Sequence, residues 1–170
     1  MSIRKAEEKD IDEIMRVTKA AKETMRARGN SIQWAGGYPD KDLWLSDIKN
    51  GNAYVVERSG RIAAVFALIF GEDSTYGYIE DGSWLNDEPY ATIHRAASDG
   101  SEHGIITEIS DYCSLRTPNL RADTHEINTV MKNALLKNGF ARCGIIYLAD
   151  GTQRVAFHKI CRGIKTEESL

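Results

Sequence analysis

The sequence predicts an α+β fold, in which a mixed, mostly antiparallel sheet of roughly six to seven strands is flanked by about four helices. Short apolar segments typical of strands alternate with segments whose apolar residues recur at helical spacing. Glycine-containing turns join several of the apolar segments directly. At 170 residues the chain is long enough to bury a substantial core and short enough to be one domain. We expect a single domain over residues 1–170, with the polar residues 162–170 as a loose tail.

The composition is typical of a globular protein in water, with 42% hydrophobic and 28% charged residues. A net charge of -3 provides no positive field, so no nucleic-acid partner is expected. The longest apolar run, residues 62–70, is about half as long as a helix that spans a bilayer, which favours a buried strand and no membrane partner. The first residues hold no apolar signal core, which predicts a cytoplasmic protein.

The spacing of the cysteine and histidine residues does not fit a metal-binding motif. Cys113, Cys143 and Cys161 are odd in number and lack paired ligand spacing, so reduced and mostly buried thiols are expected rather than disulfides. His125 lies next to acidic residues but has no second histidine at ligand spacing, so we interpret it as structural. No metal is predicted.

The first third of the chain predicts a strand and two helices. Residues 2–6 form the strand candidate. Asp10 and Glu13 fit a capping pair that opens a helix, which ends at Gly29. A second helix is expected from Asp40 to the Asn-Gly-Asn cluster that follows it.

The linker between these helices is rich in aromatic residues and glycine, and it includes Trp34 and Tyr38. Such a linker can be a shaped loop beside a pocket, or a simple turn with its rings packed inward. In the first case Trp34 and Tyr38 are candidate substrate contacts.

The middle of the chain predicts three strands and an anion site. Residues 53–57 and 62–70 flank a Ser-Gly hairpin connection. A further strand at residues 91–97 leads through Gly100 and Gly104 into a helix. Successive free amides at such a junction, with the helix dipole behind them, can bind an anion.

Residues 71–89 lack clear periodicity, apart from a small strand candidate at residues 78–80. Loops of this length are more often functional than ordinary connections. This one is acidic and aromatic, which suits a cationic amine, and Glu80 and Trp84 are the candidate contacts. The alternative is a solvated loop without a ligand.

The last third predicts a strand at residues 120–124 and a helix that Asn128 caps and Gly139 closes. Two strands then follow at residues 144–148 and 154–160, joined by an Asp-Gly hairpin turn.

This order of elements, with the glycine turn, resembles the GNAT superfamily of N-acetyltransferases over essentially the whole chain. The family's cofactor motif, Q/R-x-x-G-x-G/A, falls on residues 101–106, where Gly104 matches while Ser101 and Ile106 depart from it. A longer similarity covers residues 123–146, which follow the pattern D-T-H-x-x-N-x-x-M-x-x-x-L-x-K-x-G-F-x-x-C-G-x-I of a small bacterial branch. The resemblance implies a GNAT-like fold.

The resemblance also implies acetyl-CoA as the acetyl donor. In the family the pantetheine arm pairs with the backbone at the end of the strand before the motif, and the pyrophosphate lies against amides of the motif turn. Asn128 resembles the family's cofactor-contacting asparagine, although a helix cap needs no ligand to explain it. The implied cofactor-binding residues are Ala96, Ala97, Ser98, Ser101, Glu102, His103, Gly104, Ile105, Ile106 and Asn128.

Acetyl transfer to an amine needs an unprotonated nitrogen, a donor for the thioester oxygen and a proton for the leaving thiolate. Alternation along the strand places Tyr90, Thr92, His94 and Ala96 on one face, so His94 is the candidate base and Tyr90 a second catalytic candidate. Alternatively, His94 and Arg95 complete a hydrogen-bonded wall. The resemblance places a tyrosine acid most nearly at Leu135, where no tyrosine stands.

The sequence therefore predicts an acyltransferase: an N-acetyltransferase that moves the acetyl group of acetyl-CoA to a primary amine of a small molecule, amino acid or peptide. The transfer is expected to be direct, in a ternary complex. One alternative is a non-catalytic acyl-CoA-binding or regulatory domain, which the departures at Ser101, Ile106 and Leu135 favour. Another is an acyltransferase for longer chains. A homodimer is one assembly that the sequence allows.

Overall fold

The computed structural model describes residues 2–162, and it contains one seven-stranded sheet in the order β1-β2-β3-β4-β5-β7-β6. The pairing of β4 with β5 is parallel and all other neighbours are antiparallel, which confirms the predicted mixed, mostly antiparallel sheet. The predicted tail lies almost entirely outside the described residues. The strands are β1 (Ser2–Lys5), β2 (Ala53–Arg58), β3 (Arg61–Phe70), β4 (Ala91–Ser98), β5 (Asn119–Thr124), β6 (Ala141–Tyr147) and β7 (Gln153–Ile160), and the helices are α1 (Ile11–Ala27), α2 (Lys41–Lys49), α3 (Ile105–Ser114) and α4 (Thr129–Lys137).

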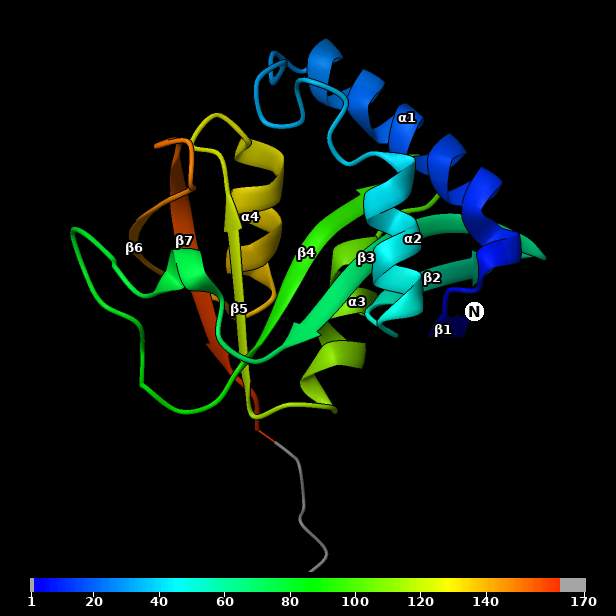
Figure 1. The fold of residues 1–170 in the computed structure, drawn as a ribbon. Coiled ribbons are helices and arrows are strands. Elements are labelled where there is room, and N and C mark those ends of the chain that lie inside the picture. The colour runs from blue at the N-terminus through cyan, green and yellow to red at the C-terminus, as the bar shows by residue number, and fades with distance from the viewer. Residues whose placement is uncertain (1, 163–170) are drawn as a thin grey trace, which may run out of the picture.

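The helices cover the sheet on both faces (Figure 1). On one face, α1 and α2 pack on β2 and β3, with Trp44 fully buried against Val55 and Val65. On the opposite face, α3 and α4 pack on the central strands around Phe66 and Phe157. The strands are buried on both sides, which is why they are continuous apolar runs in the sequence.

The predicted capping pair at Asp10 and Glu13 is wrong. The capping box lies one turn earlier, between Glu7 and Asp10, and it opens a short 3-10 turn that leads into α1. The Asp10 carboxylate accepts hydrogen bonds from the Glu7 amide at 2.8 Å and from Arg4 at 2.8 and 2.9 Å. Because Arg4 fixes Asp10 against β1, this side chain cannot cap α1.

A β-bulge interrupts β4. His94 pairs with Ala67 and Ala97 with Val65, so two residues of β4 stand opposite one residue of β3, and Arg95 has a φ of +55°. Because a bulge reverses the alternation of side chains, Ala96 packs against the core beneath α3, whereas His94 does not. The prediction that His94 and Ala96 share one face is therefore wrong.

The sheet divides between β4 and β5. These strands pair only through Ala91 with Leu120 and Thr92 with Arg121, and they then diverge (Figure 1). Beyond Thr92, β4 has no strand neighbour on that side. This gap between diverging strands positions the site described below.

Residues 71–90 cover the face of β5 to β7 that the helices leave open, through a cluster that includes Tyr76, Trp84 and Tyr90. The strand predicted at residues 78–80 is reduced to a single bridge between Glu80 and Ile145. The two segments approach closely at this bridge, where a Cβ atom on Gly144 would lie 2.3 Å from the Glu80 carbonyl oxygen, so the position requires glycine.

The three cysteines are buried and unpaired, as predicted. Within residues 2–162, no helix combines the length and the apolar character that a membrane span requires.

Candidate active site

A cavity of about 890 Å³ opens where β4 and β5 diverge. Its walls come from β4, the end of β5, the first turns of α3 and α4, the β6–β7 hairpin and the linker between α1 and α2. A volume of this size is typical of small-molecule and cofactor sites. The linker that the sequence left as either a pocket loop or a simple turn is a wall of this cavity.

The structure brings together about half of the residues predicted for the site. Those that line the cavity are Trp34, Tyr38, His94, Ala96, Ala97, Ser98, Ile106 and Asn128. The remaining predicted residues lie outside its lining, namely Glu80, Trp84, Tyr90, Ser101, Glu102, His103, Gly104 and Ile105.

His94 is hydrogen-bonded to Asp73, and both side chains are about one fifth exposed. The Asp73 Oδ2 atom lies 2.9 Å from His94 Nε2, and its Oδ1 atom accepts from the amide and the hydroxyl of Thr75 at 2.9 and 2.6 Å. The hydrogen bond from His94 lowers the pKa of Asp73 well below its usual range. Asp73 is therefore ionised, so Nε2 of His94 carries a proton and Nδ1 is left as the basic nitrogen.

Tyr90 lies behind this pair. Its hydroxyl oxygen accepts a hydrogen bond from the Asp73 amide at 2.8 Å, and the ring is largely buried against Tyr76. In this position Tyr90 fixes the backbone that carries Asp73 and does not itself face the cavity.

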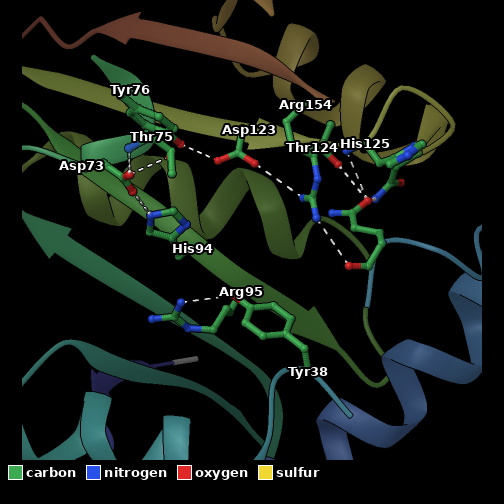
Figure 2. A network of polar contacts seen from close by, with 12 residues as sticks. Tyr38, Asp73, Thr75, Tyr76, His94, Arg95, Asp123, Thr124, His125 and Arg154 are labelled. Carbon is green, nitrogen blue, oxygen red and sulfur yellow. Dashed lines mark hydrogen bonds and ion pairs between the residues drawn. The ribbon is translucent and has the colours of Figure 1, made fainter. Parts of the chain in front are cut away.

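A second polar chain runs along β5 and β7 (Figure 2). The buried hydroxyl of Tyr76 donates to Asp123 Oδ2 at 2.6 Å, and burial raises the pKa of Tyr76 well above its ordinary value. The other carboxylate oxygen of Asp123 lies 3.5 Å from Nη1 of Arg154. Asp123 and Arg154 both line the cavity, and the sequence indicated neither as a site residue.

The opposite wall holds Arg95 and Tyr38. Arg95 reaches over α2 to bind both carboxylate oxygens of the buried Asp47, at 3.0 and 2.9 Å, and it donates to the Tyr38 hydroxyl at 3.2 Å. Burial raises the pKa of Asp47. The β4 bulge causes this arrangement, because it turns Arg95 toward α2 next to His94.

Gln33 joins the linker to the far wall. Its side-chain oxygen accepts hydrogen bonds from Asn128 Nδ2 at 3.1 Å, from Thr124 Oγ1 at 3.3 Å and from the His125 amide at 3.4 Å. The linker, the end of β5 and the N-cap of α4 are therefore held by one amide group. Asn128 also caps α4, by accepting from the Met131 amide at 3.1 Å.

The two departures from the glycine-turn motif have structural roles. The hydroxyl and amide of Ser101 both donate to Asp99, at 2.5 and 2.9 Å, so this side chain shapes the turn. Ile106 packs against the core beneath α3 and also lines the cavity. Gly104 begins α3 with a φ of +76°, which glycine adopts without strain. The first amides of α3 have no acceptor within the helix, so they are available to an anion.

The residues predicted to bind an amine in the 71–90 loop lie elsewhere. Trp84 donates its indole N–H to the Tyr76 carbonyl and stacks with Arg121, whose guanidinium carbon is 4.1 Å from the ring centre. Glu80 accepts hydrogen bonds from Tyr78 and Tyr147 at the outer surface. The loop contributes Asp73 and Thr75 to the cavity instead.

Over the described part of the chain, no group of three or more His, Cys, Asp or Glu side chains is placed to hold a metal ion. The polar groups that line the cavity include the His94–Asp73 pair, Asp123 and Arg154.

Searches with protein-family models and of curated proteins find no match to this chain. Solved structures do match. A GNAT-family acetyltransferase from Streptococcus agalactiae has 34% sequence identity and a TM-score of 0.85, with 94% of each chain covered. A GNAT-family acetyltransferase from Listeria monocytogenes, at 17% identity, has a TM-score of 0.69 over 94% of each chain. The ribosomal-protein-S18-alanine N-acetyltransferase from Escherichia coli, at 12% identity, has a TM-score of 0.62 over 99% of each chain.

The fold and the first of these similarities define an acyltransferase. The chain belongs to the GNAT family of acetyltransferases, the family that the glycine turn and the pattern over residues 123–146 indicated. Members of this family use acetyl-CoA.

Proposed function

We propose that the protein is an N-acetyltransferase that transfers the acetyl group of acetyl-CoA directly to a primary amine in a ternary complex. The observation that carries this proposal is the His94–Asp73 pair, which lies in the cavity where β4 parts from β5. A base at this point is next to the stretch of β4 that the family resemblance assigns to the acyl donor.

The residues present suit such a donor. Beyond Thr92, β4 offers backbone groups without a β5 partner, which supports the prediction that residues 96–98 pair with the pantetheine arm. The turn at residues 101–106 offers the first amides of α3 to the phosphates. Near this turn, Arg58 of β2 pairs with Glu108 of α3 and lies 3.9 Å from the Glu102 carboxylate, so its positive charge is shared between two carboxylates.

His94 acts on the amine. An ammonium group must lose a proton before its nitrogen can attack the thioester carbonyl, and Nδ1 of His94 is the nitrogen available to take it. Asp73 holds the ring in this orientation and stabilises the resulting imidazolium. The amine nitrogen forms a bond to the carbonyl carbon while an amide on β4 donates to the carbonyl oxygen. The carbon–sulfur bond then breaks, and the nitrogen gives up its second proton to water.

The leaving thiolate takes its proton through water or from the imidazolium. Leu135, at the slot where the resemblance expects a tyrosine acid, is buried and lines the cavity. It carries no proton to donate.

Thiol release from acetyl-CoA, measured over a panel of primary amines, amino acids and peptides, tests the proposal. We expect release that depends on the acceptor, together with calorimetric binding of the cofactor alone. Cofactor binding without acceptor-dependent release would support the alternative of a non-catalytic binding domain. Faster release from propionyl-CoA or succinyl-CoA would instead support an acyltransferase for longer chains. No binding heat and no release would overturn all three.

A further inference from the structure

Along one wall of the cavity, negatively charged side chains lie toward one end and a positively charged side chain lies at the other. Asp73 and its partner His94 lie at one end, Asp123 follows, and Arg154 lies at the far end beside the linker (Figure 2). The carboxylates are therefore on the side of the proposed base, and the guanidinium is on the other side. A ligand with a positive end and a negative end matches this order.

Arg154 is the least satisfied cation of the cavity. Its side chain is only 11% exposed, yet its contacts are long, at 3.5 Å to Asp123 and 3.4 Å to the Gln33 carbonyl oxygen. Among the described residues, its buried Nε atom has no hydrogen-bond partner. Because the contacts of Nη1 and Nη2 are long, these two atoms keep donor capacity for an acceptor that enters the cavity.

The other cavity cations do not offer the same opportunity. Arg95 is already bound to both oxygens of Asp47 at 3.0 and 2.9 Å. Arg28 is exposed at the cavity mouth, where water screens its charge. Arg154 is the buried guanidinium with free donor capacity, and guanidinium groups pair best with planar carboxylates.

Asp123 does not cancel this preference. Its Oδ2 atom already accepts from Tyr76 at 2.6 Å, which is a shorter contact than the one from Oδ1 to Arg154. The Asp123 carboxylate is therefore shared between Tyr76 and Arg154, and its 3.5 Å contact to the guanidinium is longer than a direct hydrogen bond. The carboxylate also lines the cavity, where it attracts an ammonium group.

We infer that the acceptor is an amino-acid-like compound, which carries a carboxylate a few bonds from the amine that is acetylated. Arg154 binds the carboxylate, and the amine lies toward Asp123 and His94. This inference rests on the proposed function, because it assigns a substrate class to the same site. A polyamine or a peptide N-terminus has no carboxylate at that distance, so neither would match Arg154.

Matched triplets of acceptors test the inference on the unaltered protein. Each triplet holds a free amino acid, its C-terminal amide and the amine that lacks the carboxylate, all assayed with acetyl-CoA. We expect a kcat/KM for the best amino acid at least about tenfold above that of its amide and its amine, the size expected for a charge-assisted hydrogen bond.

Variants then assign the effect to Arg154. We expect Arg154→Gln to raise KM for the amino acid about tenfold or more and to leave the KM of its amide nearly unchanged, while Arg154→Lys recovers part of the loss. Arg142→Gln is the matched control, since Arg142 is exposed on β6 and does not line the cavity.

The outcomes separate the two proposals. Equal or better turnover of the amides and amines would overturn the amino-acid assignment and leave the acetyltransferase intact. An amino-acid preference that survives Arg154→Gln would overturn the role of Arg154. If none of the acceptors in any triplet supports thiol release, the proposed function is overturned, and the inference with it.

Discussion

His94 and Asp73 come from different elements, β4 and the loop before it, and their side chains meet only in the folded protein. Asp73 is further fixed by Thr75 and by the Tyr90 hydroxyl. A base held by an ionised carboxylate in a fixed orientation needs little reorganisation as it takes a proton.

Replacing His94 by Gln removes the base but keeps a side chain that can hydrogen-bond Asp73. We expect kcat to fall by about 10²-fold or more, while the dissociation constant of acetyl-CoA changes little. Steady-state kinetics and calorimetry measure the two quantities. Tyr90→Phe, which removes only the acceptor for the Asp73 amide, is expected to cause a smaller loss of kcat. Unchanged turnover in His94→Gln would remove His94 from the mechanism.

Asn128 combines a helix cap with a side-chain amide that lines the cavity and donates to Gln33, and two substitutions separate these roles. Asn128→Ser keeps a good cap, so we expect nearly unchanged stability but weaker acetyl-CoA binding. Asn128→Ala loses both, and the free energy of unfolding is expected to fall by about 1 kcal/mol. Denaturant unfolding and calorimetry distinguish them. If Asn128→Ser binds the cofactor as well as the unaltered protein, Asn128 is a cap alone.

At the scale of elements, the linker between α1 and α2 depends on one side chain. Gln33→Ala removes the acceptor shared by Thr124, the His125 amide and Asn128. We expect faster amide exchange across residues 28–40 and a severalfold higher KM for the acceptor, because these three hydrogen bonds and a fourth from Asn30 are lost. Exchange mass spectrometry measures the first effect. Gln153→Ala is the control, since Gln153 is exposed on β7. Equal exchange in both variants would contradict this role for Gln33.

The loop of residues 71–90 is held by His158 of β7, which is fully buried and neutral. Its Nδ1 accepts from the Leu85 amide at 3.1 Å, so Nε2 donates to Asn119 Oδ1 at 2.9 Å. Burial, followed by the nearby Arg121 charge, lowers the pKa of His158 from its ordinary value of 6.5 to about 4. Protonation would place a second positive charge there and remove the acceptor for Leu85.

A lowered histidine pKa gives a defined pH dependence. His158 binds a proton below about pH 6.5 in the unfolded chain but only below about pH 4 in the folded chain. The contribution of neutral His158 to the free energy of unfolding is therefore fully present above pH 6.5 and is lost as the pH falls from 6.5 to 4. Denaturant unfolding from pH 7 to pH 4 should show this fall, and His158→Gln should show less of it. A flat profile over this range would contradict the assignment.

The sequence predicts most elements of the fold and part of the site. Strands and helices follow from apolar periodicity, since both faces of the sheet are buried. The β4 bulge could not be foreseen, because Arg95 carries no sequence sign of its positive φ. Asp73 and Arg154 were missed because their significance comes from neighbours far away in the chain, His94 and Asp123. Gln33 lies in the linker whose role the sequence left open, and the hydrogen bonds that its side chain accepts from Thr124, the His125 amide and Asn128 depend on the tertiary fold.

At the scale of the whole molecule, residues of β2 and β3 alternate between the two faces of the sheet, so both helical layers share the same strands. We propose that the chain is one domain and predict a single cooperative unfolding transition. Trp34 and Trp44 report on the α1–α2 layer and Trp84 on the 71–90 loop. A Trp34→Phe/Trp44→Phe double variant and a Trp84→Phe variant therefore separate the two signals. Their fluorescence midpoints should coincide with the far-ultraviolet circular dichroism midpoint. Separate midpoints would indicate two folding units.

Because β4 pairs with β5 through only two residue pairs, the sheet consists of two halves that are joined along a short seam, namely those two pairs. The cavity lies at the open side of these two halves, so its width depends on the angle at the seam. Ala91 and Leu120, both fully buried there, help to set that angle through their side-chain volumes. Neither lines the cavity. Substitutions at these two buried positions would therefore change the width of the cavity, and with it the size of acceptor that fits, without changing any residue that lines the cavity.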